Sequence, residues 1–244
     1  MAVVSNFIPG LLYNLQHKDQ SDCNKCLFKA LSCQYVNPGE FQKLQQSSLR
    51  VHFAKGEEIL RQGAKSAHLV FLQSGIVKIS MQDESGKGLI LTITRSPAML
   101  GGADALNNGL NLYSLQAIEE CEVCLIDIGT LLEIARTNSM FTLKLMEMMA
   151  MMFKASILNF ISLAHKQVNG RIADIVLYLS RSVYLDTTFT LSLSRKEIAE
   201  FAGCSTENVI HTLSKFHREG IIQVIGKKIV ILDTGRLERI SKLG

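Results

Sequence analysis

Six cysteines are the residues of this 244-residue chain best suited to chemistry. Cys23, Cys26 and Cys33 form a C-x2-C-x6-C run near the N-terminus, and Cys121 and Cys124 form a later C-x2-C pair. Thiolates bind zinc and iron–sulfur clusters and undergo redox chemistry, so the pattern allows a metal centre, a thiol switch or plain buried thiols. We expect the sixth, Cys204, to be a packed thiol.

The N-terminal sequence has neither a basic n-region nor a small-residue cleavage site, which predicts a cytoplasmic protein with reduced thiols. The most apolar stretch, residues 140–164, is interrupted by Lys144, Glu147 and Lys154. It falls short of the roughly 20 uninterrupted apolar residues that a bilayer requires. We therefore expect no membrane segment.

The composition, 47% apolar and 20% charged, is typical of a folded protein. The net charge of +4 has a clear location. From Lys166 onward there are twelve basic and eight acidic residues, whereas the rest of the chain is balanced. The last third of the chain is therefore the part that would attract an anionic partner.

The hydrophobic pattern changes twice along the chain, which predicts an α+β protein. Short β-rich runs separated by glycines fill residues 49–128 and predict an antiparallel sandwich or roll. Residues 138–166 follow a helical period, and the last part has short helices and a hairpin. We expect an arm at 1–36, a roll at 37–135, a long helix at 136–168 and a final domain at 169–244.

The long predicted helix is apolar on two faces. One stripe has the alternating spacing of three and four that coiled coils use: Leu143, Met146, Ala150, Phe153, Ile157, Phe160 and Ala164. A second, interrupted stripe contains Leu145, Met149, Met152 and Leu163. Either the helix is a core helix of one domain, or one stripe packs on the roll and the other on a second copy of the chain.

The C-terminal part has the pattern of a winged helix-turn-helix. Ser194 and Glu197 form a capping box, and Ala199, Gly203 and Val209 have the spacing that two crossing helices need. Residues 221–232 predict a hairpin with a basic tip. The alternative is a helical hairpin that binds nothing. The residues that we expect to face DNA are Ser205, Thr206, Glu207, Asn208, Ile210, His211, Ser214, Lys215, Lys227 and Lys228.

These residues predict a division of labour on DNA. Glu207 can accept a hydrogen bond from a cytosine amino group in the major groove. Lys215, Arg218, Lys227 and Lys228 are suited to phosphates, which set affinity and register rather than sequence.

The segments GCSTENV at 203–209, KF at 215–216 and EGII at 219–222 resemble the DNA-binding signature of the cyclic-AMP receptor protein and fumarate-nitrate reductase regulator family (CRP/FNR). The resemblance extends over nearly the whole chain. It implies a cyclic-nucleotide-binding-like β-roll (jelly roll), a dimerisation helix and a C-terminal winged helix. It also implies a homodimer that binds near-palindromic double-stranded DNA and recruits or blocks RNA polymerase. The family glutamate falls on Glu207, but His211 replaces the usual arginine, so we do not expect the usual half-site.

The resemblance also addresses what the roll senses. Cyclic-nucleotide members hold the phosphate with an arginine, whereas residues 100–114 here contain no arginine or lysine, so cyclic-nucleotide binding is disfavoured. Similarity to the oxygen-sensing branch implies a [4Fe-4S] cluster on Cys23, Cys26, Cys33 and Cys124, with Cys121 as a substitute ligand. The second arm spacing is one residue longer than the common pattern. Zinc on the same thiols, a thiol switch, another ligand, or heme on His17, His52 or His68 are the alternatives.

Oxygen-sensing members commonly carry an acidic residue in the middle of the dimer helix, but residues 153–163 have none. We therefore expect a dimer that depends less on its cofactor, in which sensing reorients the DNA-binding domains. An enzyme is not expected. Gly86 and Gly88 are followed by Leu91 where a dinucleotide fingerprint needs its third glycine, and the histidines show no metal-binding spacing.

Overall fold

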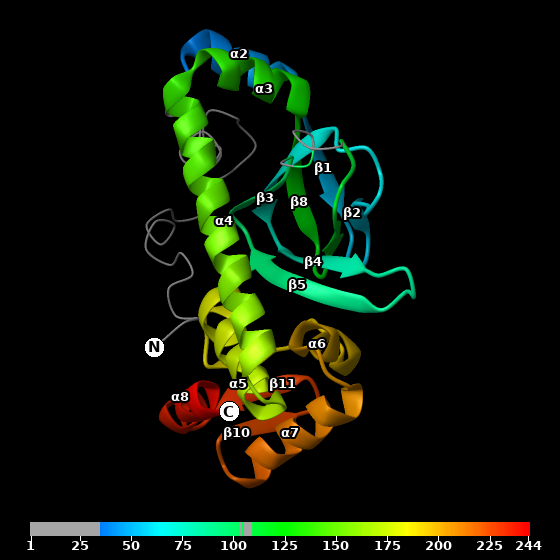
Figure 1. Cartoon of the computed structure of the whole chain (residues 1–244), viewed down its shortest axis with the longest axis vertical. Coiled ribbons are helices and arrows are strands. Elements are labelled where there is room, and N and C mark those ends of the chain that lie inside the picture. Colours follow the sequence, from blue (N-terminus) through cyan, green and yellow to red (C-terminus); the bar gives the residue numbers. More distant parts are fainter. Residues whose placement is uncertain (1–34, 103, 105–108) are drawn as a thin grey trace. The chain divides into compact units, whose positions relative to one another are not determined.

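The computed structural model describes residues 35–102, 104 and 109–244. Figure 1 shows the elements in chain order by colour. The chain divides into two compact units, and each is discontinuous in sequence. Among the described residues, the C-terminal unit contains residues 78–94 and 155–244, and the roll unit contains residues up to 77 and 95–154.

The roll consists of short antiparallel strands, as the glycine-punctuated runs predict. One sheet has the order β1(Ser48–Phe53), β8(Cys121–Asp127), β3(His68–Ser74), β6(Ala98–Gly101). The other has the order β2(Glu58–Leu60), β7(Ser114–Ala117), β4(Ile76–Gln82), β5(Gly88–Arg95), and the division into units passes through β4. Gly75 joins β3 to β4 with a φ of 94°, and a Cβ there would lie 2.3 Å from the carbonyl oxygen of Glu120. Only glycine fits this turn.

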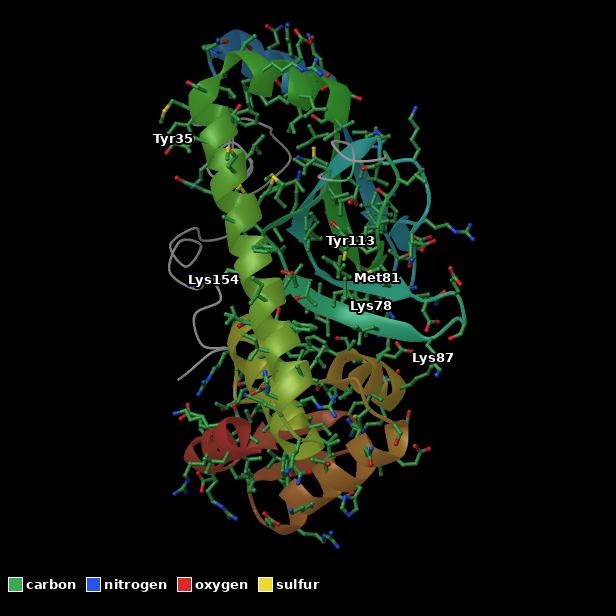
Figure 2. The ribbon with its side chains drawn as sticks, in the orientation of Figure 1. Tyr35, Lys78, Met81, Lys87, Tyr113 and Lys154 are labelled. Carbon is green, nitrogen blue, oxygen red and sulfur yellow. The ribbon has the colours of Figure 1, made fainter. Side chains whose placement is uncertain are left out.

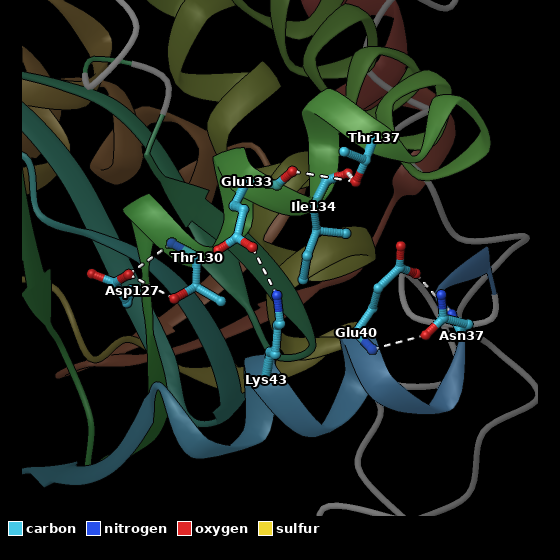
Figure 3. Close-up of polar contacts among 8 residues, drawn as sticks. All are labelled: Asn37, Glu40, Lys43, Asp127, Thr130, Glu133, Ile134 and Thr137. Atoms are coloured by element: carbon cyan, nitrogen blue, oxygen red, sulfur yellow. Dashed lines mark hydrogen bonds and ion pairs between the residues drawn. The ribbon is translucent and has the colours of Figure 1, made fainter.

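Two helices that the hydrophobic pattern did not reveal cover one face of the roll. In α2 (Pro38–Gln46), Asn37 and Glu40 form a capping box, and α3 (Ile128–Thr137) begins where Asp127 accepts a hydrogen bond from the amide of Thr130. Figure 3 shows these caps and the ion pair between Lys43 and Glu133 that joins the two helices. The core beneath them is formed by Leu44, Leu69, Phe71, Ile126, Leu131, Ile134 and Phe141.

Helix α4 (Ser139–His165) follows α3 directly and runs for 27 residues. It agrees within one residue at each end with the helical period at 138–166, whereas the long-helix segment expected at 136–168 is three residues too long at each end and includes residues of α3 and α5. Phe141 is fully buried in the roll core, and Leu145 packs against that core from one turn further on. The start of α4 is therefore held by the roll, and the rest of the helix continues into the C-terminal unit.

The C-terminal unit is a winged helix-turn-helix with additions. Helix α5 (Val168–Tyr178) passes into the π-helix η4 (Leu179–Tyr184), for which Leu185 is the C-cap. Next come β9 (Thr188–Thr190), α6 (Arg195–Ala202) and α7 (Thr206–Arg218). Strands β10 (Ile222–Ile225) and β11 (Lys228–Ile231) form the expected hairpin, to which β9 adds a third strand. The chain then forms α8 (Thr234–Leu243), a helix that the sequence analysis did not expect.

Candidate functional site

The predicted helix-turn-helix is present, and its local chemistry explains it. Ser194 accepts from the amide of Glu197 at 3.2 Å, and the Glu197 carboxylate accepts from the amide of Ser194 at 2.8 Å, so the capping box is complete. Helix α6 ends at Gly203 with a φ of 58°, the left-handed conformation that glycine adopts without strain. Ala199 and Val209 are buried where α6 and α7 cross.

Helix α7 presents one exposed face. Its buried residues are Val209, Thr212, Leu213 and Phe216. The predicted DNA-facing residues Glu207, Asn208, Ile210, His211 and Ser214 are exposed, and Thr206 and Lys215 are half-buried. The hydroxyl of Ser205 accepts from the amide of Asn208 at 3.2 Å, so this residue caps the helix. The base contacts of this face remain a prediction.

Glu207 stands at the N-terminal end of this face. Hydrogen bonds from its own amide and from the hydroxyl of Ser205 hold the pKa of Glu207 below its usual range. The positive end of the helix dipole also favours a carboxylate at this position. Glu207 is therefore ionised at neutral pH and can only accept hydrogen bonds, which suits the amino group of cytosine.

The wing is tied to α6 by a residue that the sequence analysis missed. Lys227 and Lys228 are exposed at the turn between β10 and β11. The guanidinium of Arg195 donates to the carbonyl of Gly226 in that turn at 3.0 Å, and burial lowers the pKa of Arg195. His217 also accepts, through Nδ1, from the amide of Val224 at 3.2 Å. These contacts hold the basic tip at a defined place beside the helices.

The hairpin of β4 and β5 contacts the first helix of the motif within the C-terminal unit. Lys78, labelled on β4 in Figure 2, forms an ion pair with Glu197 at 2.6 Å. Burial acts to raise the pKa of Glu197, but hydrogen bonds from Lys78 and Ser194 outweigh it, so the pKa lies below its usual range. Tyr178 donates to the carbonyl of Ile93, and its ring meets Phe201 edge-on at 6.0 Å. These contacts had no sequence signal, because the two partners in each are far apart in the chain.

The seven residues of the predicted coiled-coil stripe on α4 are all exposed: Leu143, Met146, Ala150, Phe153, Ile157, Phe160 and Ala164. Phe153 and Phe160 are 69% and 70% exposed. Of the second stripe, Leu145 and Leu163 are half-buried, Met149 is exposed, and the side chain of Met152 lies outside the described residues. A single chain therefore leaves a continuous apolar surface along one side of α4.

The cysteines fall into different surroundings. Cys121 is buried, its thiol donates to the carbonyls of Ile76 and Glu119 at 3.4 and 3.3 Å, and burial raises its pKa. Cys124 is half-buried and packs against the roll core under α2 and α3. Burial also raises the pKa of the half-buried Cys204, which supports the packed-thiol expectation. Cys23, Cys26 and Cys33 lie outside the described residues, within which no cluster of three or more His, Cys, Asp or Glu side chains could hold a metal.

Part of the segment 100–114, where the resemblance to the family would place a cyclic-nucleotide phosphate, is also described. The amide of Gly101 donates to the hydroxyl of Tyr113 at 3.1 Å, and the amide of Leu112 donates to the carboxylate of Asp104 at 3.1 Å. Burial raises the pKa of Tyr113. Two amides that could bind an anion are thus occupied by the protein's own side chains, and one of these side chains is a carboxylate.

Two family models match the chain. Residues 50–138 match the cyclic nucleotide-binding domain, and residues 170–240 match the Crp-like helix-turn-helix domain. In the described part of the chain, no helix combines the length and apolar character that a membrane span needs.

Curated relatives align with most of this chain at low identity. The CRP-like cAMP-activated global transcriptional regulator of Mycobacterium tuberculosis is 26% identical over 220 residues, 88% of this chain and 98% of that protein. The transcriptional activator protein anr of Pseudomonas aeruginosa is 28% identical over 184 residues, 74% of this chain and 75% of that protein.

Solved structures share the fold. FixK2 from Bradyrhizobium japonicum superposes with a TM-score of 0.71 at 22% identity, covering 79% of this chain and 96% of that chain. A protein described as a regulator of the crp/fnr family from Eubacterium rectale gives a TM-score of 0.75 at 18% identity, covering 86% and 97%.

Proposed function

Because this chain belongs to the CRP/FNR family of DNA-binding transcriptional regulators, we propose that it binds a near-palindromic DNA site as a homodimer under the control of a [4Fe-4S] cluster. Like the relatives named above, the protein is a transcriptional regulator. It is not an enzyme. In this proposal the bound dimer recruits or blocks RNA polymerase in the cytoplasm.

The exposed face of α7 carries the DNA-binding part of the proposal. Glu207 is the acceptor for a cytosine amino group, and Ser205, Thr206, Asn208, Ile210 and Ser214 lie on or beside the same face. Lys215, Lys227 and Lys228 contact phosphates. His211 offers an imidazole in place of the bidentate arginine that the family usually has at this position, so we propose a half-site that differs from the usual family sequence.

The apolar stripe of α4 is the proposed dimer interface. Seven residues at coiled-coil spacing are exposed in the single chain, and a second copy of α4 would bury them. The stretch 153–163 contains no acidic residue, so like charges do not oppose association there. We therefore propose a dimer that forms with or without cofactor, in which sensing reorients the DNA-binding domains.

The position of Cys124 supports the cluster. Cys124 and Val36 pack against the same core cluster of the roll, and Cys33 precedes Val36 by three residues. The side chain of Cys124 thus packs on the same core as the start of the described chain. Cys124 is half-buried whereas Cys121 is buried, and Cys124 falls on the roll ligand that the resemblance implies, so we propose Cys124 as the fourth ligand with Cys23, Cys26 and Cys33.

The proposed cluster would supply redox and oxygen-sensitive chemistry, and the protein residues would supply its attachment. Three thiolates from the arm and one from β8 would join the arm to the roll, so loss of the ligation would release the arm. Zinc bound by the same thiols, a thiol switch and heme on His52 or His68 are outcomes that the test below distinguishes.

A cyclic nucleotide is the second candidate effector, because several relatives of comparable identity are described as cAMP-activated. Two observations argue against it here. The segment 100–114 contains no arginine or lysine, and its Gly101 and Leu112 amides are already engaged. A buried phosphate would lack the cation that it needs.

The decisive experiment is a spectrum of the full chain purified without oxygen, together with metal and sulfide analysis. We expect broad charge-transfer absorption that air bleaches. Cys124→Ser should abolish it, and the matched variant Cys121→Ser should retain it. A sharp Soret band would indicate heme, bound zinc without colour would indicate a zinc site, and a colourless metal-free protein that binds cAMP in calorimetry would favour the nucleotide.

A further inference from the structure

We propose that Asp174 is a positioning residue that fixes the joint between α4 and α5, and that it thereby sets the half-site spacing that the dimer accepts. The proposal rests on the proposed dimer through α4, and it is independent of the cluster. All of the contacts involved lie within the C-terminal unit.

Asp174 is a buried carboxylate, only 6% exposed, in the middle of α5. It accepts from the hydroxyl of Ser162 on α4 at 2.7 Å and from the ammonium of Lys166, in the link between the helices, at 2.8 and 2.7 Å. It also accepts from the hydroxyl of Ser241 on α8. One carboxylate therefore joins the end of α4, the link, α5 and the C-terminal helix.

This arrangement favours one geometry of the joint. A buried carboxylate is tolerated because it is paired and hydrogen-bonded, and loss of a partner is costly. Each donor comes from a different segment, so a rotation of α4 against α5 would separate Asp174 from Ser162 or Lys166. The short link of Lys166 and Gln167 is held as well, because Lys166 forms an ion pair with Asp174.

The contacts of Asp174 with Ser162, Lys166 and Ser241 are called the clasp here. A close backbone contact between α5 and α8 reinforces it. A Cβ added to Gly170 on α5 would lie 2.6 Å from the carbonyl oxygen of Gly244, so the two segments touch through their backbones. The end of α8 is thus seated on the first turn of α5, and the same helix presents Ser241 to Asp174.

The clasp extends to the recognition helix through two further contacts of α5. Asn169 accepts from the hydroxyl of the buried Thr212 on α7 at 3.0 Å. Arg171 donates to the carbonyl of Gly203, in the turn of the motif, at 3.0 Å. The position of α5 therefore determines the position of α7, and Asp174 determines the position of α5 relative to the end of α4.

This geometry matters for DNA because the last turns of α4 also carry Ile157, Phe160 and Ala164 of the dimer stripe. Two recognition helices must enter major grooves about one helical turn, roughly 34 Å, apart. A fixed joint allows one separation. A loosened joint would let the helices adapt to half-sites that are one or two base pairs too close or too far apart.

The test measures spacing discrimination. A site is first selected from random duplex DNA with the full chain. The Kd for DNA is then measured by fluorescence anisotropy on three kinds of duplex. These are the selected site, versions with one or two base pairs added or removed between the half-sites, and a single half-site. The variants are Asp174→Asn, which keeps the volume, and Lys166→Met, with Lys166→Arg as the conservative rescue. Glu238→Gln is the control, because it breaks the pair of Arg181 with α8 and leaves the clasp intact.

For the wild type we expect the altered spacings to weaken binding by roughly tenfold or more, which corresponds to at least about 1.4 kcal/mol. Asp174→Asn and Lys166→Met should reduce this factor to about twofold while changing half-site affinity by less than about twofold. Lys166→Arg and Glu238→Gln should behave as wild type.

Equal losses on the full site and the half-site would show that Asp174 only supports folding, and unchanged spacing discrimination would show that the joint is set elsewhere. Either result overturns the proposal. Should Asp174→Asn fail to fold, Lys166→Met alone decides, because it leaves the serine donors in place. Sedimentation of the wild type identifies failure of the underlying dimer separately: a monomer would remove the basis for a spacing rule.

Discussion

Replacement of Phe160 by alanine should weaken the dimer strongly and leave the monomer fold intact. The side chain is 70% exposed in the single chain, so little of its packing lies within the monomer. Full burial of a phenylalanine contributes about 1.5 to 3 kcal/mol, and about 70% of that is available at the interface. The dimer contains two copies, so the change should cost about 3 kcal/mol, or about 100-fold in the dimer Kd.

Sedimentation velocity over a concentration series gives this Kd directly. The matched control is Leu112→Ala, which removes a comparably exposed apolar side chain, 58% accessible, from the roll instead of the stripe. Circular dichroism would show that helix content is unchanged. If Phe160→Ala shifts the Kd by less than about fivefold, or if the control shifts it as much, the stripe is not the interface and the reasoning from spacing and exposure fails.

Three other predictions follow from the described geometry. Glu207→Ala should cost about 1 to 3 kcal/mol and relax specificity at one base pair per half-site, seen by binding selection on randomised sites. Lys228→Ala should weaken binding about equally on all sequences and lower the slope of log K against log salt by about 1, seen by titration at several salt concentrations. Asp127 has its pKa lowered by hydrogen bonds from Thr130, so it stabilises the fold above its unfolded pKa of about 3.9, and this stabilisation is lost as the pH falls through the lower folded pKa. Asp127→Asn keeps a cap that does not titrate, so urea unfolding across this acidic range should show a weaker pH dependence than the wild type.

The parts of the fold that could be predicted are those with local causes. Ser194 and Glu197 are three residues apart, and Gly203 ends the helix that they begin, so sequence alone defines α6. The stripe on α4 follows from spacing, and its exposure agrees with that spacing. The different surroundings of Cys121 and Cys124 follow from strand geometry, because residues three apart on a strand point to opposite faces.

Other features had a local signal that was missed. Asn37, Pro38 and Glu40 have the pattern of a helix start, and the structure shows a capping box there. Asp233 likewise caps α8, a helix that follows the wing directly. Both helices are short and lack a long apolar period, so hydrophobic periodicity does not predict them.

The joint around Asp174 could not be predicted from local sequence. Its donors Ser162, Lys166 and Ser241 are separated from it by up to 67 residues, and only the packed unit brings them together. A buried aspartate in a helix is unfavourable by propensity and by burial, so its presence is explained only by partners that tertiary structure supplies.

The hairpin of β4 and β5 has a consequence for how the protein is made. Its residues 78–94 belong to the same compact unit as residues 155–244, with Lys78 paired to Glu197 and the Ile93 carbonyl bound by Tyr178. A fragment that begins at α5 would lose both partners, so we expect it to melt at a lower temperature than the same residues in the full chain. During synthesis the hairpin leaves the ribosome well before α5 and α6, and the DNA-binding end of the protein therefore completes its fold on strands that are already made.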